Sequence, residues 1–416
     1  MAGDSASHAK VYNGYQYYYN MLFGTRGSSI GTDPGAAVRR VCLMIGRLDA
    51  GGAEKQLTLL AAELAGRGVA TSVLLLFGGG GPREAQLRAA GVEVVDLGFG
   101  RRHGRRAIAA NLAVFGRTVG HLRRIRPDVV HAFLLHTYLV AAPAAWCARV
   151  PAMVAGRRSM AYFKQGRPLL LAMERIANRL TDLVVANAEA VAVEARTQER
   201  LPADKVAVVY NGLPAGAFTP AEPAGRGELD TDLPVVLSVA NLRRVKGHRY
   251  LVDAVARLRD RGTACTLVLV GEGPEGPALR RQAERLGVDV RFLGTRWATD
   301  RLLARADVAV SASLSEGLSN AVMEAMAAGR PVVATAVGGT PELLRGRGVL
   351  VAPADAQALA DGLSTVLTDP AYAARLTGAA RAWSRVHLHV DVMVDRHLAL
   401  YEGLLAPRAT ASRRAR

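Results

Sequence analysis

The chain has 416 residues, half of them hydrophobic, and a formal net charge of +17. The length fits two ordinary domains. Because the sequence has no run of about 18 uncharged apolar residues, and no basic stretch followed by an apolar core at its N-terminus, we expect neither a transmembrane helix nor a signal peptide. The three cysteines, Cys42, Cys147 and Cys265, are odd in number and far apart. We therefore expect core thiols in a reducing cytosol, and neither a disulfide framework nor a zinc site.

The positive charge lies mainly in the first half of the chain. Residues 39–215 hold 25 basic and 13 acidic residues, whereas residues 216–405 hold 22 and 21. The clusters GRRHGRR at 100–106 and HLRRIR at 121–126 carry much of the surplus. Such patches suit an anionic partner, either a membrane surface, a phosphorylated acceptor or nucleic acid; a solvated face is an equal alternative. The sequence lacks a helix-turn-helix, an aromatic-basic strand motif and a zinc cluster, so only the charge favours a nucleic-acid binder.

Residues 1–37 show neither a helical nor a strand period, so we expect a disordered N-terminal extension. Order begins with a buried strand at 38–45, and a Gly-rich turn and an amphipathic helix follow within 46–68. A second strand at 69–77 completes a βαβ unit. The alternation continues with strands near 92–97, 128–133, 151–156, 182–187 and 205–213, and with helices near 107–125, 136–148 and 168–179.

The alternation pauses at 214–232, where Pro and Gly are typical of a linker. It resumes with strands near 233–242, 266–274, 290–294, 306–313 and 331–335, and with helices near 247–261 and 276–286. The pattern predicts an α/β protein with two doubly wound parallel-sheet (Rossmann-like) domains, at 38–213 and 233–389. A last helix at 390–405 precedes a basic tail at 406–416. In such sheets, ligands bind outside the carboxyl ends of the strands.

The segment 311–335, SASLSEGLSNAVMEAMAAGRPVVAT, carries the clearest functional pattern. Ser319 is a good N-cap for a helix that ends near Gly329. A helix N-terminus carries about half a positive charge and unpaired N–H groups, so it suits a phosphate. Glu316 lies in the loop before this helix, and Glu324 lies about 7.5 Å along its axis from Ser319. A phosphate seat flanked by two hydroxyl-binding carboxylates predicts a sugar-nucleotide site.

This segment resembles the signature of the family-4 (group 1) retaining glycosyltransferases, in which seven residues separate two glutamates. The matching positions are Glu316, Gly317, Ser319, Asn320, Glu324, Ala325, Ala327, Gly329 and Pro331. The resemblance extends over about residues 40–402. It implies the two-domain B-type fold (GT-B), with an acceptor-binding domain first, a nucleotide-sugar donor domain second and a cleft between them. It also implies that the last helix crosses back to the first domain.

The resemblance assigns roles within this loop and helix. It implies that Glu316 holds hydroxyls of the transferred sugar and that Glu324 holds the ribose. Leu318, Ser319 and Asn320 then belong to the donor-binding loop between the two carboxylates.

The resemblance continues after the strand at 233–242. The family places an Arg and a Lys on the donor diphosphate, where they neutralise the leaving group. Lys246 matches that Lys, but Asn241 stands in place of the Arg. Arg243 or Arg244 must therefore serve instead, or the site is weakened; an exposed basic loop is the alternative.

Two histidines and a glycine turn resemble first-domain features of the family. Gly51 and Gly52 match a turn whose backbone amides face the donor phosphates, although any tight turn also favours glycine. His136 resembles a histidine close to the reacting sugar. A core histidine is the alternative both for it and for His131.

Arg157 and Arg158 stand where many relatives have a second histidine, so we expect them on the acceptor side, against a phosphate-bearing or otherwise anionic acceptor. Weaker similarities place Gly271 in a donor-binding turn. They also place Phe292 and Leu293 where backbone groups contact the nucleobase, and the pair at 211–212 at the hinge between the domains.

We therefore predict a metal-independent, retaining hexosyltransferase that moves a sugar from a nucleoside-diphosphate sugar to a glycan, lipid-linked or small-molecule acceptor, as in polysaccharide biosynthesis. No cofactor is expected, and no Asp-x-Asp loop suggests a metal. We expect a cytoplasmic protein, or one peripheral on the inner face of the cell membrane, where Arg101, Arg102, Arg105 and Arg106 would lie near the acceptor and attract anionic lipid. The alternative is a catalytically weak sugar-nucleotide-binding protein of the same fold. The sugar, the choice of UDP or GDP, the acceptor and the oligomeric state are not encoded in recognisable motifs.

Overall fold

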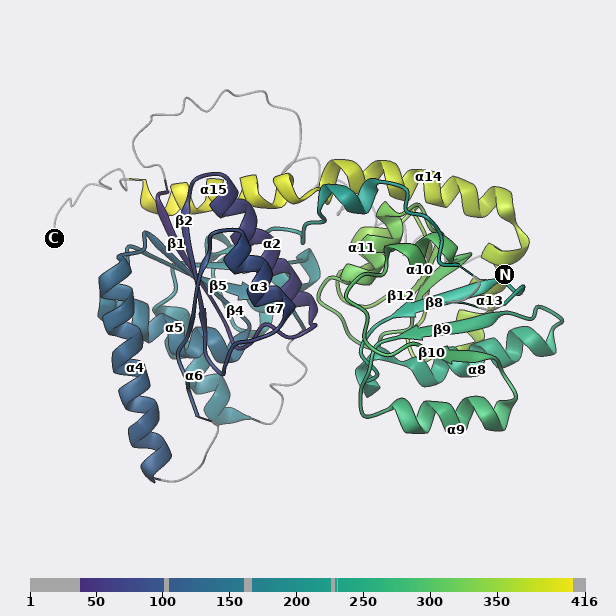
Figure 1. Cartoon of the computed structure of the whole chain (residues 1–416), viewed down its shortest axis with the longest axis horizontal. Helices are drawn as coiled ribbons and strands as arrows, with labels where there is room; N and C mark the ends of the chain where they lie inside the picture. The colour runs from purple at the N-terminus through teal and green to yellow at the C-terminus, as the bar shows by residue number, and fades with distance from the viewer. Residues whose placement is uncertain (1–37, 101–104, 161–166, 226–228, 230, 407–416) are drawn as a thin grey trace, which may run out of the picture. The chain divides into compact units, whose positions relative to one another are not determined.

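Two parallel β-sheets with helices on both faces organise the chain (Figure 1). The computed structural model describes residues 38–100, 105–160, 167–225, 229 and 231–406. The strand order is β3-β2-β1-β4-β5-β6-β7 in the first sheet and β10-β9-β8-β11-β12-β13 in the second. The prediction of two doubly wound parallel-sheet domains is confirmed. The expected extension at 1–37 and the tail at 407–416 lie outside the described residues.

The strands of the first sheet alternate with helices along the chain. The strands are β1 (Arg40–Ile45), β2 (Ala70–Leu75), β3 (Glu93–Asp96), β4 (Val129–Phe133), β5 (Ala152–Arg157), β6 (Leu183–Ala186) and β7 (Val206–Val208). The helices are α2 (Gly52–Gly66), α3 (Pro82–Ala89), α4 (Arg105–Ile125), α5 (Leu135–Ala148), α6 (Pro168–Arg179), α7 (Glu189–Gln198) and the 3-10 turns η2 (Ala203–Lys205) and η3 (Ala215–Phe218).

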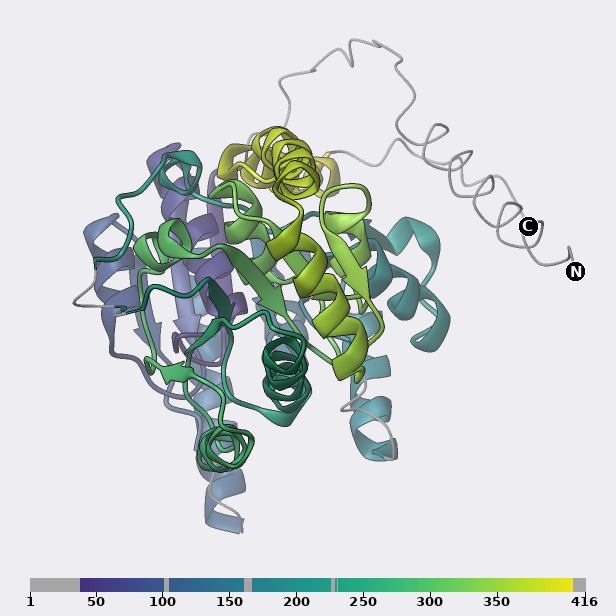
Figure 2. The same ribbon diagram turned by 90° about the vertical axis from the view of Figure 1, so that its right-hand side faces the viewer.

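The second sheet follows the same plan, and Figure 2 turns its green elements toward the viewer. Its strands are β8 (Val235–Val239), β9 (Thr266–Val270), β10 (Val290–Phe292), β11 (Val308–Ser311), β12 (Val332–Thr335) and β13 (Val349–Val351). Its helices are η4 (Arg244–Lys246), α8 (His248–Asp260), α9 (Gly276–Leu286), α10 (Asp300–Arg305), α11 (Asn320–Ala327), α12 (Thr340–Leu344), α13 (Ala356–Thr368) and α14 (Pro370–His387), and α15 (Val390–Leu405) ends the described chain.

The side-chain alternation of a strand explains how each sheet buries both of its faces. In β1, Val41 and Leu43 join a core cluster that includes α2, α3 and α15. Cys42 and Met44 point the other way and join the cluster that includes α4, α5, α6 and α7. Since both faces are covered, the strands are near-continuous apolar runs, which is the pattern that made them recognisable in the sequence.

Several elements were missed by the sequence analysis. α3 and α7 complete crossovers of the first sheet, and α12, β13, α13 and α14 fill residues 340–387, for which no element was predicted. α13 and α14 are rich in alanine and pack against each other, and α12 has only five residues, so these segments offer fewer large apolar side chains as a signal.

The chain passes between the two sheets twice. It first passes after β7, and it returns after α14, which packs against α11 and α13. Beyond this helix α15 packs against α2, and Arg67, the C-cap of α2, donates to the carboxylate of Asp391 at 2.7 Å. The two passages are joined by backbone hydrogen bonds, from Leu213 N to Leu388 O at 2.7 Å and from Val390 N to Leu213 O at 2.8 Å.

The strand orders locate the crevices of the two sheets. In the first sheet the order reverses between β1 and β4, and in the second between β8 and β11. Loops that follow such a pair of strands diverge to opposite faces and leave a crevice at the carboxyl edge, where α/β proteins bind ligands. The four segments after these strands are therefore expected to line the ligand-binding crevices.

Candidate active site

Lys246 and Glu316 meet at the carboxyl edge of the second sheet. Lys246 ends the turn after β8, Glu316 lies in the loop after β11, and these strands are neighbours. The Lys246 ammonium group forms an ion pair with Oε1 of Glu316, and Ser313 Oγ donates to the same oxygen at 2.8 Å. The side chains are 21% and 12% exposed, so this pair is largely shielded but still open to a ligand on one side.

Two glycines allow the backbone to close around this pair. Gly247 follows Lys246 with φ of 65°, and a Cβ there would overlap the carbonyl oxygen of Ala312. Gly338 has φ of 51°, and a Cβ there would overlap the carbonyl oxygen of Glu316 itself. Only glycine satisfies both the left-handed backbone and the close approach. The loop that carries Glu316 is thus held from two sides.

The helix that follows Glu316 begins as expected. Ser319 is the N-cap of α11, and its hydroxyl accepts from Val322 N at 3.4 Å, so the predicted cap is confirmed. Leu318 is buried beside it. Farther along the helix, Glu324 Oε1 accepts from Lys55 Nζ at 2.7 Å, and Thr299 Oγ1 donates to Oε2 at 3.4 Å.

Asn320 connects the second domain with the first. Its Nδ2 donates to the carbonyl of Gly52 at 3.1 Å, and its Oδ1 accepts from Asn211 Nδ2 at 2.7 Å. Gln56 Nε2 also reaches this oxygen, at 3.3 Å. Gly52 begins α2 and Gly51 is its N-cap, so the glycine turn lies beside the signature helix, with Lys55 one helical turn further on.

A groove of about 1080 Å³ opens beside Glu324. Its lining includes Lys55, Trp297, Thr299 and the segment 213–214. A drug-sized ligand fits a cavity of roughly 300–1,000 Å³. This groove therefore has room for a nucleotide whose hydroxyls reach Glu324.

The two histidines of the β4 region have different environments. His131 is fully buried, its Nδ1 lies 2.7 Å from the Tyr401 hydroxyl, and burial holds its pKa well below the usual range. It is a core histidine. His136 is exposed in the first turn of α5. The residue before this helix, Leu134, has φ of 71°, which is rare for a bulky residue. Such strain is concentrated at functional sites.

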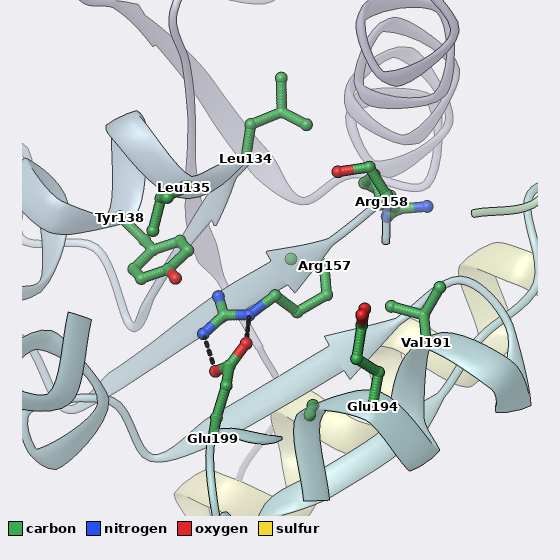
Figure 3. Close-up of a pocket in the computed structure, with 11 residues that line it drawn as sticks. Leu134, Leu135, Tyr138, Arg157, Arg158, Val191, Glu194 and Glu199 are labelled. Carbon is green, nitrogen blue, oxygen red and sulfur yellow. Dashed lines mark hydrogen bonds and ion pairs between the residues drawn. The ribbon is translucent and has the colours of Figure 1, made fainter. Parts of the chain in front are cut away.

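Arg157 ends β5 and Arg158 directly follows it, but their side chains have different surroundings (Figure 3). Arg157 Nη2 donates to Glu199 at 2.8 Å and to Asn178 at 2.8 Å, and its guanidinium group lies 3.9 Å from the Tyr138 ring centre. Its charge is balanced inside the domain, so the geometry gives no support to the predicted acceptor contact of Arg157.

The Arg158 guanidinium group has fewer hydrogen-bond partners than that of Arg157. Its Nη1 donates to Asn211 at 2.7 Å and its guanidinium group lies over the Phe133 ring, while Nε and Nη2 have no hydrogen-bond partner among the described residues. Burial lowers its pKa to about 10. Both arginines line the small pocket of Figure 3, and the two nitrogens of Arg158 that lack a described partner make it the better candidate for the acceptor side.

The remaining predicted donor residues lie around the second sheet. Arg243 and Arg244 are exposed in and before η4, next to Lys246. Gly271 has φ of 139° and leaves no room for a Cβ beside Ala240. Phe292 and Leu293 end the edge strand β10, where Leu293 N donates to Leu269 O at 3.0 Å. That amide is used by the sheet, so only other backbone groups of these two residues remain for a base.

Sequence reasoning missed Lys55, Gln56 and Thr299 as members of the site. Lys55 and Gln56 directly follow the glycine turn, so their position after β1 was a usable signal. Thr299 had none, because its contact with Glu324 depends on how the loop after β10 folds.

Other structural findings concern metals, thiols and membranes. Within the described ranges, no three His, Cys, Asp or Glu side chains come together as a metal site would require. Metal independence stays a prediction. The three cysteines are free, and Cys42 and Cys265 are buried. None of the described helices combines the length and the apolar character that a membrane span needs.

Comparisons with known proteins agree with this geometry. A family model described as "Glycosyltransferase Family 4" matches residues 50–215, and one described as "Glycosyl transferases group 1" matches residues 233–369. The lipopolysaccharide core biosynthesis glycosyltransferase LpsE of Rhizobium meliloti (strain 1021) is 29% identical over 333 residues, covering 78% of this chain and 88% of that protein.

Two further proteins match this chain over a similar length. The D-inositol 3-phosphate glycosyltransferase of Corynebacterium glutamicum (strain R) is 30% identical over 356 residues, covering 77% of this chain and 84% of that protein. The crystal structure of HepE of Anabaena in complex with UDP-glucose superposes with a TM-score of 0.75 at 25% identity, covering 87% of this chain and 98% of that one.

Proposed function

Because this chain belongs to the family-4, or group 1, glycosyltransferases, we propose that it transfers a sugar, with retention of configuration, from a nucleoside-diphosphate sugar to a glycan, lipid-linked or small-molecule acceptor. The observation that carries this proposal is the meeting of Lys246 and Glu316 at the crevice of the second sheet, one loop away from Glu324 and its groove. In the proposal, Lys246 supplies a cation for the diphosphate, Glu316 a carboxylate for the sugar and Glu324 a carboxylate for the ribose.

In the proposed reaction the bond between the anomeric carbon and the diphosphate oxygen breaks. Lys246 and a neighbouring arginine, Arg243 or Arg244, stabilise the charge that develops on that oxygen. The acceptor hydroxyl attacks on the same face, and its proton passes to the departing phosphate. The products are a glycoside with the donor's configuration and a nucleoside diphosphate. Glu316 orients hydroxyls of the transferred sugar while the bond exchange takes place.

The ion pair fits these roles. Lys246 and Glu316 satisfy each other in the structure. A donor that places its diphosphate at the ammonium group and a sugar hydroxyl at the carboxylate replaces one ion pair with two charge-assisted contacts. The exposed arginines of η4 then add charge at the same edge.

The names of the relatives guide the choice of substrates. HepE of Anabaena was crystallised with UDP-glucose, so we propose a UDP-sugar as donor. The Corynebacterium relative is named for a phosphorylated acceptor, and Arg158 offers buried donors near His136, so we propose an acceptor that carries an anionic group. We further propose that the enzyme needs no metal and no cofactor, and that it works in the cytoplasm, peripherally on the inner face of the cell membrane.

Product analysis tests the proposal. The purified chain is incubated with a panel of UDP- and GDP-sugars, with lipid-linked and soluble acceptors, with and without a chelator. We expect a mass increment of one sugar with a UDP donor, an unchanged anomeric configuration by NMR, and no loss of activity with chelator. An inverted product rejects the retaining mechanism. Nucleotide binding without transfer or donor hydrolysis favours the alternative, a weak binding protein, for which Asn241 in place of the family arginine is the motivating observation.

A further inference from the structure

Helix α6 buries polar residues and exposes apolar ones, which is the reverse of an ordinary surface helix. Its buried residues are Glu174, Ala177 and Asn178. Its exposed residues include Leu169, Met173 and Ile176, which are 75%, 47% and 57% exposed. A surface helix normally buries its apolar stripe and exposes its polar face.

A buried polar cluster around Arg157, whose contact with Glu199 is drawn in Figure 3, explains why the polar face points inward. Glu174 accepts from the Tyr138 hydroxyl and lies 3.5 Å from Arg157. Asn178 accepts from the same guanidinium group at 2.8 Å, and its own amide donates to Glu199 at 3.0 Å. These contacts fix the rotation of α6 about its axis, so these apolar side chains are left largely exposed.

The outward face has a defined shape. At about 100° per residue, Leu169, Met173 and Ile176 fall within an arc of roughly 60°, and Arg175 and Arg179 lie together along one side of it. Both arginines are exposed. An apolar stripe with basic residues beside it is the arrangement of helices that lie in a membrane interface.

The neighbouring helices share this character. α4, α5 and α6 pack in that order and cover the same face of the first sheet. Of the nine large apolar side chains that are prominently exposed in the described residues, six belong to α4, α5, α6 and α7. In the sequence of α4, α5 and α6 the single carboxylate is Glu174, which is buried, whereas arginines are frequent. This layer is therefore basic and apolar, with no exposed carboxylate.

We propose that the outer face of α6, in the layer that α5 and then α4 continue, docks on an anionic lipid bilayer. Leu169, Met173 and Ile176 enter the boundary between headgroups and acyl chains, and Arg175 and Arg179 contact the headgroup phosphates. This inference rests on the proposed peripheral membrane association and names its surface; it does not depend on the transfer chemistry. α6 follows the β5 edge at which Arg158 lies, so docking holds the proposed acceptor side against the lipid.

A bilayer explains the face better than a second copy of the chain does. A symmetric contact would bring the same patch of both copies together, arginines included. A stable interface also buries about 800 Å² on each partner. Three side chains on a helix about 18 Å long fall well short of that area. Anionic headgroups, in contrast, neutralise the arginines, so the small apolar stripe is sufficient for binding.

Vesicle co-sedimentation of the full chain tests the proposal. The vesicles are phosphatidylcholine alone, or phosphatidylcholine mixed with phosphatidylglycerol. The first variant carries Leu169→Gln, Met173→Gln and Ile176→Gln, and its control is Val386→Gln, an equally exposed apolar residue of α14. The second variant carries Arg175→Gln and Arg179→Gln, and its control is Arg281→Gln with Arg285→Gln, the same spacing on α9.

We expect the wild type to bind the mixed vesicles and not the neutral ones. Each α6 variant should bind at least tenfold more weakly, and both controls should bind as the wild type does. Donor turnover with a soluble acceptor should be unchanged in all four variants, because none of these residues belongs to the proposed site. Wild-type binding that both α6 variants retain rejects α6 as the surface but keeps the membrane association. No binding by the wild type rejects the membrane association itself, while turnover still reports on the enzyme.

Thiol labelling of a Met173→Cys variant shows whether anything other than lipid covers this face of α6. The labelling is measured relative to the wild type, which has three native thiols. We expect reaction with a maleimide in solution and protection by mixed vesicles. Protection that appears only at high protein concentration shows a second copy on this face. Protection without vesicles at every protein concentration shows that another segment of the same chain covers this face. Either result overturns the proposal.

Discussion

The ammonium group of Lys55 on α2 lies 2.7 Å from Oε1 of Glu324 on α11, so a helix of the first domain and a helix of the second share an ion pair. The two residues are 269 positions apart in the chain. Both side chains are partly exposed, and an exposed pair of this kind contributes little to stability. Its significance is that Glu324 is already held in place, with its second oxygen directed to Thr299, before a nucleotide arrives.

Removal of the Glu324 carboxylate should mainly weaken donor binding. Glu324→Ala loses the charged acceptor for the ribose hydroxyls, and we expect about tenfold to hundredfold weaker nucleotide affinity, the range of a hydrogen bond to a charged group. Glu324→Gln keeps an acceptor and should be milder. Isothermal titration calorimetry with UDP measures both. Identical affinities of the wild type and Glu324→Ala would place the nucleotide elsewhere.

Loss of Lys246 should act on turnover. Lys246→Ala removes a preorganised cation from the leaving group, so kcat should fall by about 10²–10³. Nucleotide affinity should fall as well. Arg257→Ala, on the far end of the same α8 region, serves as the control and should change neither quantity. Unchanged turnover in Lys246→Ala would remove this residue from the mechanism.

A methyl group at Gly338 should displace the Glu316 loop. In Gly338→Ala the new Cβ overlaps the Glu316 carbonyl oxygen, in addition to the left-handed strain. Gly346→Ala is a matched control, because Gly346 has φ of 72° but no heavy atom within 4 Å of a Cβ there. The control should cost about 1 kcal/mol of strain and keep its activity. Gly338→Ala should lose at least tenfold in kcat/KM, measured beside its melting temperature. Equal losses in both variants would show that strain, and not the overlap, matters.

Stability should fall in acid because of the buried histidines. Burial lowers the pKa of His397 to about 3 and holds that of His131 well below its usual range, with Arg158 adding to the effect in both. Below pH about 6.5 the unfolded chain therefore binds protons that the folded chain refuses, and each histidine lowers the free energy of unfolding by roughly 1.4 kcal/mol per pH unit.

Substitution of one histidine should reduce that slope. We expect His397→Leu to lose stability less steeply than the wild type between about pH 6.5 and pH 5, by roughly 1.4 kcal/mol per unit. Urea unfolding at several pH values measures the slopes. Parallel slopes would mean that folded His397 takes up its proton in this range.

The arginines at the start of α4 should contribute to attraction by anionic lipid. Arg105 and Arg106 begin this helix, whereas Arg101 and Arg102 lie outside the described residues. Each basic residue near a charged surface contributes about 1 kcal/mol, and the attraction is screened over about 8–10 Å at physiological salt. Arg105→Gln with Arg106→Gln should therefore weaken binding to anionic vesicles at low salt about tenfold or more. Binding that is equal on neutral and anionic vesicles would leave the charge without this role.

The sequence predicted best those residues whose type is dictated by the backbone. Ser319 was recognisable because a helix start requires a cap, and the glycines because a tight βα turn requires them. The same local rules identified every strand of the first sheet and, except for β13, those of the second. Lys246 and Glu316 were predicted separately, and their pairing follows once β8 and β11 are known to be neighbours.

The rest depends on contacts that no local pattern encodes. The sequence cannot show that Lys55 reaches Glu324, because that contact depends on the relative placement of two domains. It also gave no sign that Glu199, 42 residues away, would occupy Arg157. The orientation of α6 was hidden for the same reason, since it is set by polar partners on α5 and β5.

The backbone hydrogen bonds of Leu213 with Leu388 and Val390 have a mechanical consequence. A single linker leaves the separation of two bodies free, whereas two chain passages joined to each other at one point hold the bodies together there. Any opening or closing of the two sheets must therefore pivot near this point, and a free separation is excluded.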